Sequence, residues 1–260
     1  LSTASPFDKS SFSRIALSSD GRQFAIIDDH HQIRLTDSVL NTELWVQPRA
    51  GDDSAKGLLF SPYGKALLSL DDTEIDILDT ATGNAVATIR LPETSGLLSK
   101  VAVNGDASHM AVATESETVL LWNLKTNVDV PIFLEKKQPV ERLLFSPDGQ
   151  SLVAVINGQT PHVIVWDSQS GKVRFKTESG AKISDFAFDN TSNTLALATE
   201  DGKIGFWKLR TGQAGKTIST QAGPNRIAFS PDGKNFASAS GSERPQIQYW
   251  NLASSESLFD

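Results

Sequence analysis

Residues that could ligate a metal ion occur together at one place in this chain of 260 residues. His30 and His31 follow Asp28 and Asp29, and imidazole and carboxylate groups are common metal ligands. Neighbouring residues of a strand point to opposite faces, however, and a metal site needs further ligands in fixed geometry. We therefore expect no metal at this cluster.

Patterns for nucleotide binding or nucleophilic catalysis are also weak. Gly215, Lys216 and Thr217 match the end of a phosphate-binding loop, but Arg210 stands where the first glycine of that loop should be. The chain has no cysteine, which excludes thiolate nucleophiles and disulfides, and it has no Gly-x-Ser-x-Gly nucleophile motif. We predict that the protein is not an enzyme and holds no cofactor.

The charge balance narrows the classes of partner. Lys and Arg number 24 against 31 Asp and Glu, which gives a net charge of −7. An acidic chain is a poor general binder of nucleic acid. No apolar run approaches the roughly 18–20 residues that cross a bilayer, so we expect no membrane insertion.

The elements that would position any site come from six repeats. They begin with the segments IALSSDG (15–21), LLFSPYG (58–64), VAVNGDA (101–107), LLFSPDG (143–149), FAFDNTS (186–192) and IAFSPDG (227–233). Their third residues are Leu17, Phe60, Val103, Phe145, Phe188 and Phe229, at intervals of 43, 43, 42, 43 and 41 residues. A constant period of this length indicates a repeat architecture.

Each repeat is predicted to contain four short antiparallel strands. The apolar runs are brief, rich in β-branched residues and bounded by turns such as Ser-Pro-Asp-Gly, in which Pro and Gly favour the turn backbone. Runs such as 163–166 are apolar on both faces. Sheets that are buried on both faces fit a radial stack of blades better than a sandwich.

A β-branched residue and a tryptophan three positions later recur in the later repeats. The tryptophans are Trp122, Trp166, Trp207 and Trp250, and we expect them to pack between neighbouring sheets. Trp45 lies outside this register, and we expect it nearer the rim.

These marks resemble WD-repeat proteins. Trp166 and Asp167 carry the dipeptide of that family, and the other three tryptophans precede Asn or Lys. The repeats lack the Gly-His pair of the family and so are more similar to its degenerate, prokaryotic members.

The resemblance implies an all-β protein: a β-propeller of six four-stranded antiparallel blades in one domain over residues 1–260. The blades are expected at about 13–55, 56–98, 99–140, 141–182, 183–223 and 224–260. We expect a closed or nearly closed ring within a larger polypeptide or assembly, and the alternative is a fragment of a seven-bladed or longer propeller.

Two sets of charged residues are candidates for partner binding. Four basic residues stand three positions before the repeat anchors and predict a broken cationic ring at the channel mouth: Arg14, Lys100, Arg142 and Arg226. Gly57 and Asp185 occupy the other two positions. The turns between the second and third strands are acidic, with Asp71, Asp72 and Glu74 as the densest group. Such acids can steer a basic partner segment, or they can simply be solvated turn residues.

Two of these turns are longer than the others. They contain Gln159, Thr160, Pro161 and His162 in the fourth repeat, and Glu243 and Arg244 in the sixth. Insertions in repeat proteins lie in loops that often face a partner, which makes these residues candidates as well.

The resemblance and the weak catalytic patterns together favour a non-catalytic scaffold or sensor module that binds a protein or peptide. A small-anion or ligand binder at the channel mouth is the first alternative, and a propeller hydrolase or a purely structural spacer are others. The expected location is the cytoplasm, with the cell envelope or periplasm as the alternative.

Overall fold

The computed structural model describes residues 12–49, 56–93, 96–116, 118–124, 128–133, 138–220, 226–240, 246–254 and 257–259. These residues form strands, turns and short connections, and no helix among them is long and apolar enough to cross a membrane. They contain six sheets of four strands each. We call each sheet a blade and number the blades in chain order.

The first three blades take up the N-terminal half of the chain. Blade 1 contains β1 (Phe12–Leu17), β2 (Gln23–Asp28), β3 (Gln32–Asp37) and β4 (Thr42–Pro48). Blade 2 contains β5 (Gly57–Phe60), β6 (Ala66–Leu70), β7 (Glu74–Asp79) and β8 (Ala85–Arg90). Blade 3 contains β9 (Leu98–Val103), β10 (His109–Thr114), β11 (Thr118–Asn123) and β12 (Val128–Phe133).

The other three blades repeat the same order. Blade 4 contains β13 (Arg142–Phe145), β14 (Ser151–Ile156), β15 (His162–Asp167) and β16 (Val173–Glu178). Blade 5 contains β17 (Ile183–Phe188), β18 (Thr194–Thr199), β19 (Lys203–Lys208) and β20 (Ala214–Ser219). Blade 6 contains β21 (Arg226–Phe229), β22 (Asn235–Ser240), β23 (Gln246–Asn251) and β24 (Ser257–Phe259). Consecutive strands pair antiparallel, which confirms the predicted fold class.

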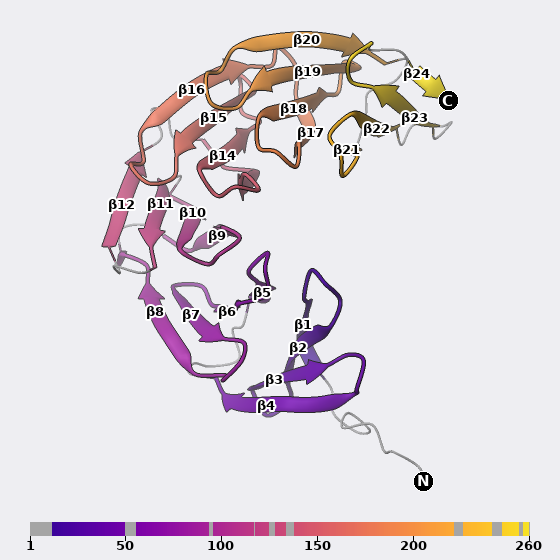
Figure 1. The fold of residues 1–260 in the computed structure, drawn as a ribbon. Coiled ribbons are helices and arrows are strands. Elements are labelled where there is room, and N and C mark those ends of the chain that lie inside the picture. The colour runs from indigo at the N-terminus through magenta and orange to yellow at the C-terminus, as the bar shows by residue number, and fades with distance from the viewer. Residues whose placement is uncertain are drawn as a thin grey trace.

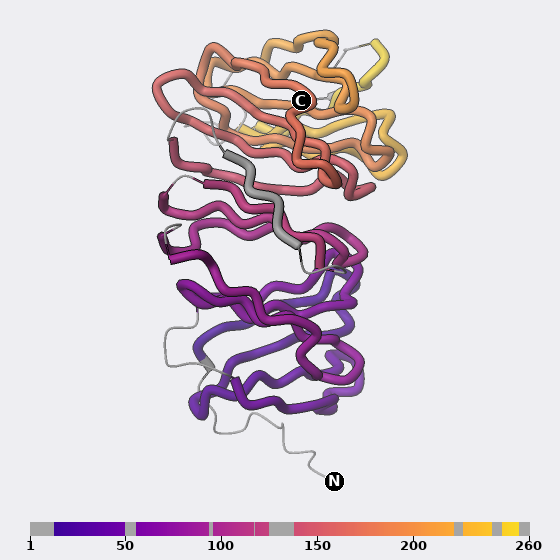
Figure 2. Tube along the Cα trace, turned by 90° about the vertical axis from the view of Figure 1, so that its left-hand side faces the viewer, coloured from indigo at the N-terminus to yellow at the C-terminus, as the bar shows by residue number. Residues whose placement is uncertain are grey.

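The six blades stand side by side around an open arc. The first strands, such as β1, β5 and β9, lie on the concave side, and the fourth strands, such as β4, β8 and β20, lie on the convex side (Figure 1). Seen from the side, the N-terminal blades lie at one end of the molecule and the C-terminal blades at the other (Figure 2). Each core cluster of the described residues accordingly joins two blades that are adjacent in the sequence.

The turns between first and second strands close by the predicted mechanism. In blade 4 the Ser146 hydroxyl donates to Oδ1 of Asp148 at 2.6 Å, and the Gly149 N–H donates to the Ser146 carbonyl at 2.8 Å. Gly149 has a φ of 70°, a conformation that glycine adopts without strain. The serine, aspartate and glycine therefore fix where the first strand turns back in blade 4, and blades 1 and 6 have the same serine–aspartate bond.

The hydrophobic core consists of five clusters, each shared by two adjacent blades. The cluster between blades 4 and 5, for example, joins Val163 and Val165 of β15 to Leu195 and Leu197 of β18. Trp122, Trp166 and Trp250 are each less than a tenth exposed and lie in clusters of this kind. Burial between blades, on both faces of the inner blades, is what the apolar runs predict.

The two ends of the arc are uncovered in the part of the chain that the structure describes. Ile247 of blade 6 is 66% exposed, whereas its counterparts in the other blades, such as Val163, are at most 2% exposed. Leu17 of blade 1 is 64% exposed, whereas the equivalent Phe60 is 7% exposed. The six blades therefore form an open arc, which differs from the expected closed or nearly closed ring. Each terminal blade presents an apolar face where a further neighbour would pack.

Candidate partner-binding surfaces

The strand order places the connections of every blade on two opposite faces of the arc. We call the face with the turns between second and third strands the bc face. The opposite face, which carries the turns between first and second strands, is the ab face. The links from a fourth strand to the next first strand also emerge on the bc face.

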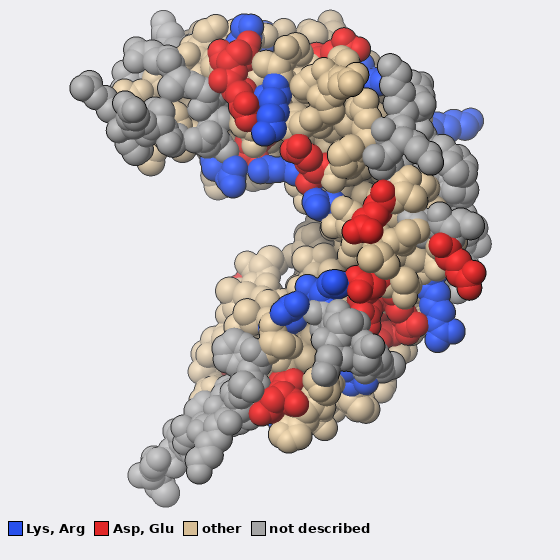
Figure 3. Space-filling model, turned by 180° about the vertical axis from the view of Figure 1, so that it is seen from behind, with Lys and Arg blue, Asp and Glu red and all other residues tan. Residues whose placement is uncertain are grey.

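The four predicted cationic positions lie on first strands, toward the bc face. Arg14 is in β1, Lys100 is in β9, and Arg142 and Arg226 begin β13 and β21. Because first strands line the concave side, these residues share that edge, and Figure 3 shows Lys and Arg side chains gathered along it. The predicted basic ring is thus a row along the inside of an open arc.

Several of these residues connect neighbouring blades. The Arg142 guanidinium forms an ion pair with Asp185 at the equivalent position of the next blade. Asp185 is 5% exposed, and its other carboxylate oxygen accepts a hydrogen bond of 2.9 Å from the Ile227 backbone N–H. In the same way, Arg14 donates to the Lys56 carbonyl at 3.1 Å and links blade 1 to blade 2. Part of the basic row therefore has a structural role.

A polar pocket of about 290 Å³ lies where blades 4, 5 and 6 meet on this edge. Arg142 and Arg226 line it together with Asp185, Lys182 and Glu200. Lys182 and Glu200 form an exposed pair at 3.3 Å across the mouth. The pocket holds both signs of charge, so it suits a peptide with its own polar groups better than a bare anion.

The acidic turn of blade 2 is neutralised within the molecule. Asp71 pairs with Arg49 at 2.7 Å, Asp72 with Lys56 at 3.1 Å and Glu74 with Arg90 at 2.8 Å. The Arg49 side chain is 1% exposed, so its pair with Asp71 is largely enclosed. These acids lie on the bc face as predicted, but each already has a basic partner.

The longer turn of blade 4 is only partly at the surface. Gln159 and Thr160 are exposed, whereas His162 is 6% exposed and its Nδ1 lies 2.7 Å from the Thr160 carbonyl oxygen. The Pro161 carbonyl accepts a hydrogen bond of 3.1 Å from the Ser179 N–H. His162 therefore helps to hold the turn and is not presented to a partner. The longer turn of blade 6, with Glu243 and Arg244, lies outside the described residues.

Asp28, Asp29 and His30 bring three potential metal ligands within 4.8 Å of one another. Asp28 ends β2, and Asp29 and His30 lie in the turn that follows, so the alternation of a strand does not separate them, unlike the expectation from the sequence. Oδ1 of Asp28 accepts the backbone N–H groups of His30 and Gln32, and Oδ2 accepts Arg34 at 2.6 Å. Burial raises the pKa of Asp28, but these hydrogen bonds outweigh it and hold the pKa below its ordinary value. The cluster is a closed, ion-paired turn, and we assign no metal to it.

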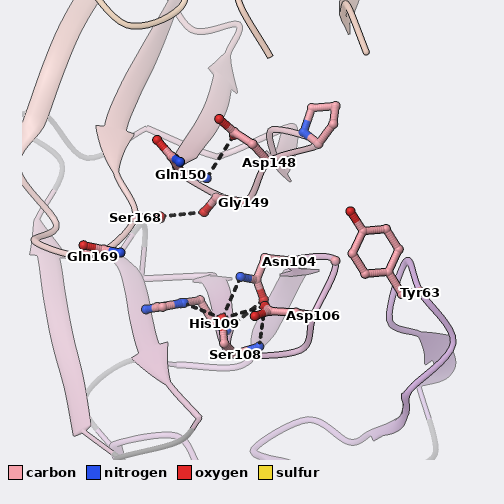
Figure 4. A pocket seen from close by; sticks show the side chains of 12 residues that line it. Tyr63, Asn104, Asp106, Ser108, His109, Asp148, Gly149, Gln150, Ser168 and Gln169 are labelled. Atoms are coloured by element: carbon pink, nitrogen blue, oxygen red, sulfur yellow. Dashed lines mark hydrogen bonds between the residues drawn. The ribbon is translucent and has the colours of Figure 1, made fainter. Parts of the chain in front are cut away.

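Sequence reasoning missed a pocket of about 320 Å³ on the ab face. It lies between the turns of blades 3 and 4, with Asp106 and His109 on one side, Asp148 and Gln150 on the other, and Tyr63 of blade 2 at its mouth (Figure 4). The Ser108 hydroxyl lies 2.6 Å from Oδ1 of Asp106 and 2.9 Å from Nδ1 of His109. One sequence signal could have revealed it, because Tyr63 stands where most of the other repeats have aspartate.

The comparisons with known proteins agree with this architecture. No model of a known protein family matches the chain. Over 190 residues, 71% of this chain and 59% of the relative, it is 24% identical to "Protein LST8 homolog" of Drosophila melanogaster. It is 31% identical to "Eukaryotic translation initiation factor 3 subunit I" of Pyricularia oryzae, over 40% of this chain and 30% of that one. A Synechocystis protein, "Uncharacterized WD repeat-containing protein sll1491", is 25% identical over 62% of this chain and 46% of its own length.

Stacked four-stranded blades around an arc define the β-propeller class of repeat protein. With its recurring tryptophans, the chain has this architecture and is distantly similar to WD-repeat proteins. It spans less than two thirds of the length of each of these relatives. Because they come from an animal, a fungus and a cyanobacterium, they do not test the predicted prokaryotic character.

Proposed function

We propose that the chain is a non-catalytic scaffold or sensor module that binds a protein or peptide partner along the concave edge of its bc face. WD-repeat proteins are typically non-catalytic interaction scaffolds. One relative carries a name that describes a subunit of an assembly, "Eukaryotic translation initiation factor 3 subunit I". We further propose that this chain acts within a larger polypeptide or assembly, in the cytoplasm.

The observation that carries this proposal is the pocket at blades 4 to 6. Its charged groups are held on strand ends that are fixed by burial between blades, so little conformational entropy is lost when a partner binds. Arg142 and Asp185 hold each other in place, while Lys182 and Glu200 remain about half exposed. A peptide could pair with both signs of charge there.

The acidic turns have a smaller part in the proposal. Asp71, Asp72 and Glu74 form ion pairs within blade 2 or with its immediate flanks, so we propose that they set local structure rather than recruit a basic segment. Gln159 and Thr160 remain candidates for contact at the rim because both are exposed.

A small-anion binder is the second candidate function. Arg14 and Lys100 are exposed and donate to the Lys56 and Ser99 carbonyl oxygens, and among the described residues neither forms an ion pair with a carboxylate. Titration with inorganic phosphate tests this candidate. If the two charges bind an anion, the affinity of the chain for phosphate should fall stepwise in Arg14→Ala and Lys100→Ala. If they do not, the affinity for phosphate should not change.

Crosslinking mass spectrometry on the native protein tests the main proposal. Exposed lysines mark both faces of the arc: Lys56, Lys100 and Lys182 lie on the bc face, and Lys65, Lys172 and Lys234 lie on the ab face. Partner crosslinks from the first set support the proposal, whereas partner crosslinks confined to the second set contradict it.

A pair of charge-reversal variants makes the test specific. Lys182→Glu together with Lys100→Glu should reduce partner capture several-fold, because two positive charges of the concave bc edge become negative. The matched control is Lys65→Glu with Lys234→Glu, which changes the net charge equally on the other face. Equal loss in both variants would mean that only the overall charge matters.

A further inference from the structure

The turn between β5 and β6 differs from the equivalent turns of the other blades. At its third position blades 1, 4 and 6 have Asp20, Asp148 and Asp232, each of which accepts a hydrogen bond from the first serine of its turn at 2.6–2.7 Å. Blade 2 has Tyr63, which is too long to close a turn in this way, and its side chain is 65% exposed. A large exposed aromatic residue thus replaces a group that stabilises the turn.

The Tyr63 ring is held in place by the next blade. It lies so close to Gly105 that a Cβ on that glycine would be 2.6 Å from Cε2 of the ring. The absence of a side chain at position 105 therefore lets the ring rest on the backbone of blade 3. This contact fixes an aromatic side chain at the mouth of the ab-face pocket (Figure 4).

Tyr63 and Pro147 line two adjoining pockets of different character. The pocket of about 320 Å³ is polar, with Asp106 on one side and Asp148 on the other, and the exposed Arg210 guanidinium lies 3.9 Å from Oδ2 of Asp148. The second pocket, of about 310 Å³, lies toward the first strands and is lined by apolar side chains, of which Leu144 is 45% exposed. A polar pocket that contains two carboxylates and an apolar pocket thus share one aromatic and proline wall.

We infer that this double pocket binds an extended segment of a partner protein in which a basic residue stands next to an aliphatic residue or proline. The basic side chain enters between Asp106 and Asp148, where the charge is complementary. The apolar residue packs against Tyr63, Pro147 and Leu144, in the manner of extended segments that bind aromatic grooves. This site lies on the ab face and does not depend on the function proposed for the bc face.

The matched variant for this site is Tyr63→Asp, which gives blade 2 the same turn sequence as blades 4 and 6. The new carboxylate can accept the Ser61 hydroxyl, so the melting temperature should stay equal or rise, while the aromatic wall is lost. A library of short random peptides is selected on the wild-type chain. The enriched peptides should carry Arg or Lys beside an aliphatic residue or proline, and Tyr63→Asp should weaken their binding by at least about tenfold.

Two further variants separate charge from shape. Asp106→Asn should weaken the binding of the selected peptides and abolish the preference for a basic residue. Gly105→Ala should displace the Tyr63 ring and weaken binding without a change of charge. The inference is overturned if Tyr63→Asp binds the peptides as well as the wild type does, or if peptides with Glu in place of the basic residue bind equally. It is also overturned if the chain self-associates through this face, so that dilution rather than peptide uncovers it.

Discussion

The Arg142 guanidinium pairs with the carboxylate of Asp185, the residue at the equivalent position of the next blade, 43 residues away. Asp185 also accepts the Ile227 N–H of the blade after that. One buried carboxylate thus joins three successive blades at the concave edge.

Asp185→Asn should lower the free energy of unfolding by about 1–3 kcal/mol, because a neutral amide cannot replace a buried, charge-assisted bond. Urea denaturation followed by tryptophan fluorescence measures the change. The matched control is Asp201→Asn, which removes the pair with Lys203 between partly exposed side chains, 58% for the lysine and 37% for the aspartate. That loss should stay below about 1 kcal/mol. Equal losses would show that Asp185 does not join the blades energetically.

The uncovered end of the arc can be tested at Ile247. Val163→Thr places a hydroxyl in a fully buried position and should cost about 1–3 kcal/mol. Ile247→Thr makes the corresponding change at a position that is 66% exposed and should alter stability by less than about 0.5 kcal/mol. Thermal melting of both variants gives the comparison. A large loss in Ile247→Thr would mean that this face is covered in solution.

Stability should depend on pH at the turn of blade 4 that follows β15. The hydrogen bond from Arg174 at 2.7 Å, together with bonds from Ser170, lowers the pKa of Asp167 from 3.8 to about 2. A carboxyl whose pKa is lower in the folded state stabilises the fold above pH 3.8, and this stabilisation is lost as the pH falls from 3.8 toward 2. Because the side chain is 32% exposed, solvent screening limits the effect to about 1 kcal/mol.

Asp167→Asn isolates this effect because an amide oxygen can still accept the turn hydrogen bonds. The wild type should be more stable than the variant at pH 6, and the difference should disappear by about pH 2. Urea denaturation across this range measures it. A difference that does not change with pH would point to turn geometry rather than to charge.

Trp45 and Gly83 give a test of packing between blades 1 and 2. The indole N–H donates to the Thr80 carbonyl at 2.9 Å, and a Cβ on Gly83 would lie 2.7 Å from the ring. Gly83→Ala should therefore lower the free energy of unfolding by more than the backbone strain of a positive φ alone would. Gly21→Ala is the control, because Gly21 has a similar positive φ of 69° and no atom within 4 Å of an added Cβ.

The free energy of unfolding should fall by about 1 kcal/mol in Gly21→Ala, because of backbone strain. In Gly83→Ala it should fall by about 1–3 kcal/mol more, because the added Cβ clashes with the Trp45 ring. Tryptophan fluorescence should report a changed environment of Trp45 in Gly83→Ala and no change in Gly21→Ala. The same loss in both variants would argue against the contact.

The fold could be predicted because burial between blades requires apolar residues at regular intervals in the sequence. Val163 and its counterparts recur at one register since each must fill the same space between two sheets. The charges were harder to interpret. Asp71 and Glu74 look like a free acidic rim in the sequence, and only the three-dimensional structure places Arg49 and Arg90 beside them.

Other features depend on geometry that no short pattern encodes. Ile247 stands at the register of the buried residues, yet it is 66% exposed, and no short pattern distinguishes it from the fully buried Val163. The ab-face pocket arises from four separate turns, but Tyr63 marked it in the sequence as the departure from aspartate. A position that breaks the repeat is thus as informative as one that keeps it.

Every sheet of the described chain is built from four consecutive strands. The molecule is therefore a one-dimensional array, in which each unit gains stability only from itself and from its immediate neighbours. Folding can begin in any blade and spread outward, since no unit has to wait for a strand from a distant part of the chain. The same property means that blades 1 and 6, each with a single neighbour among the described residues, should open before the four blades between them.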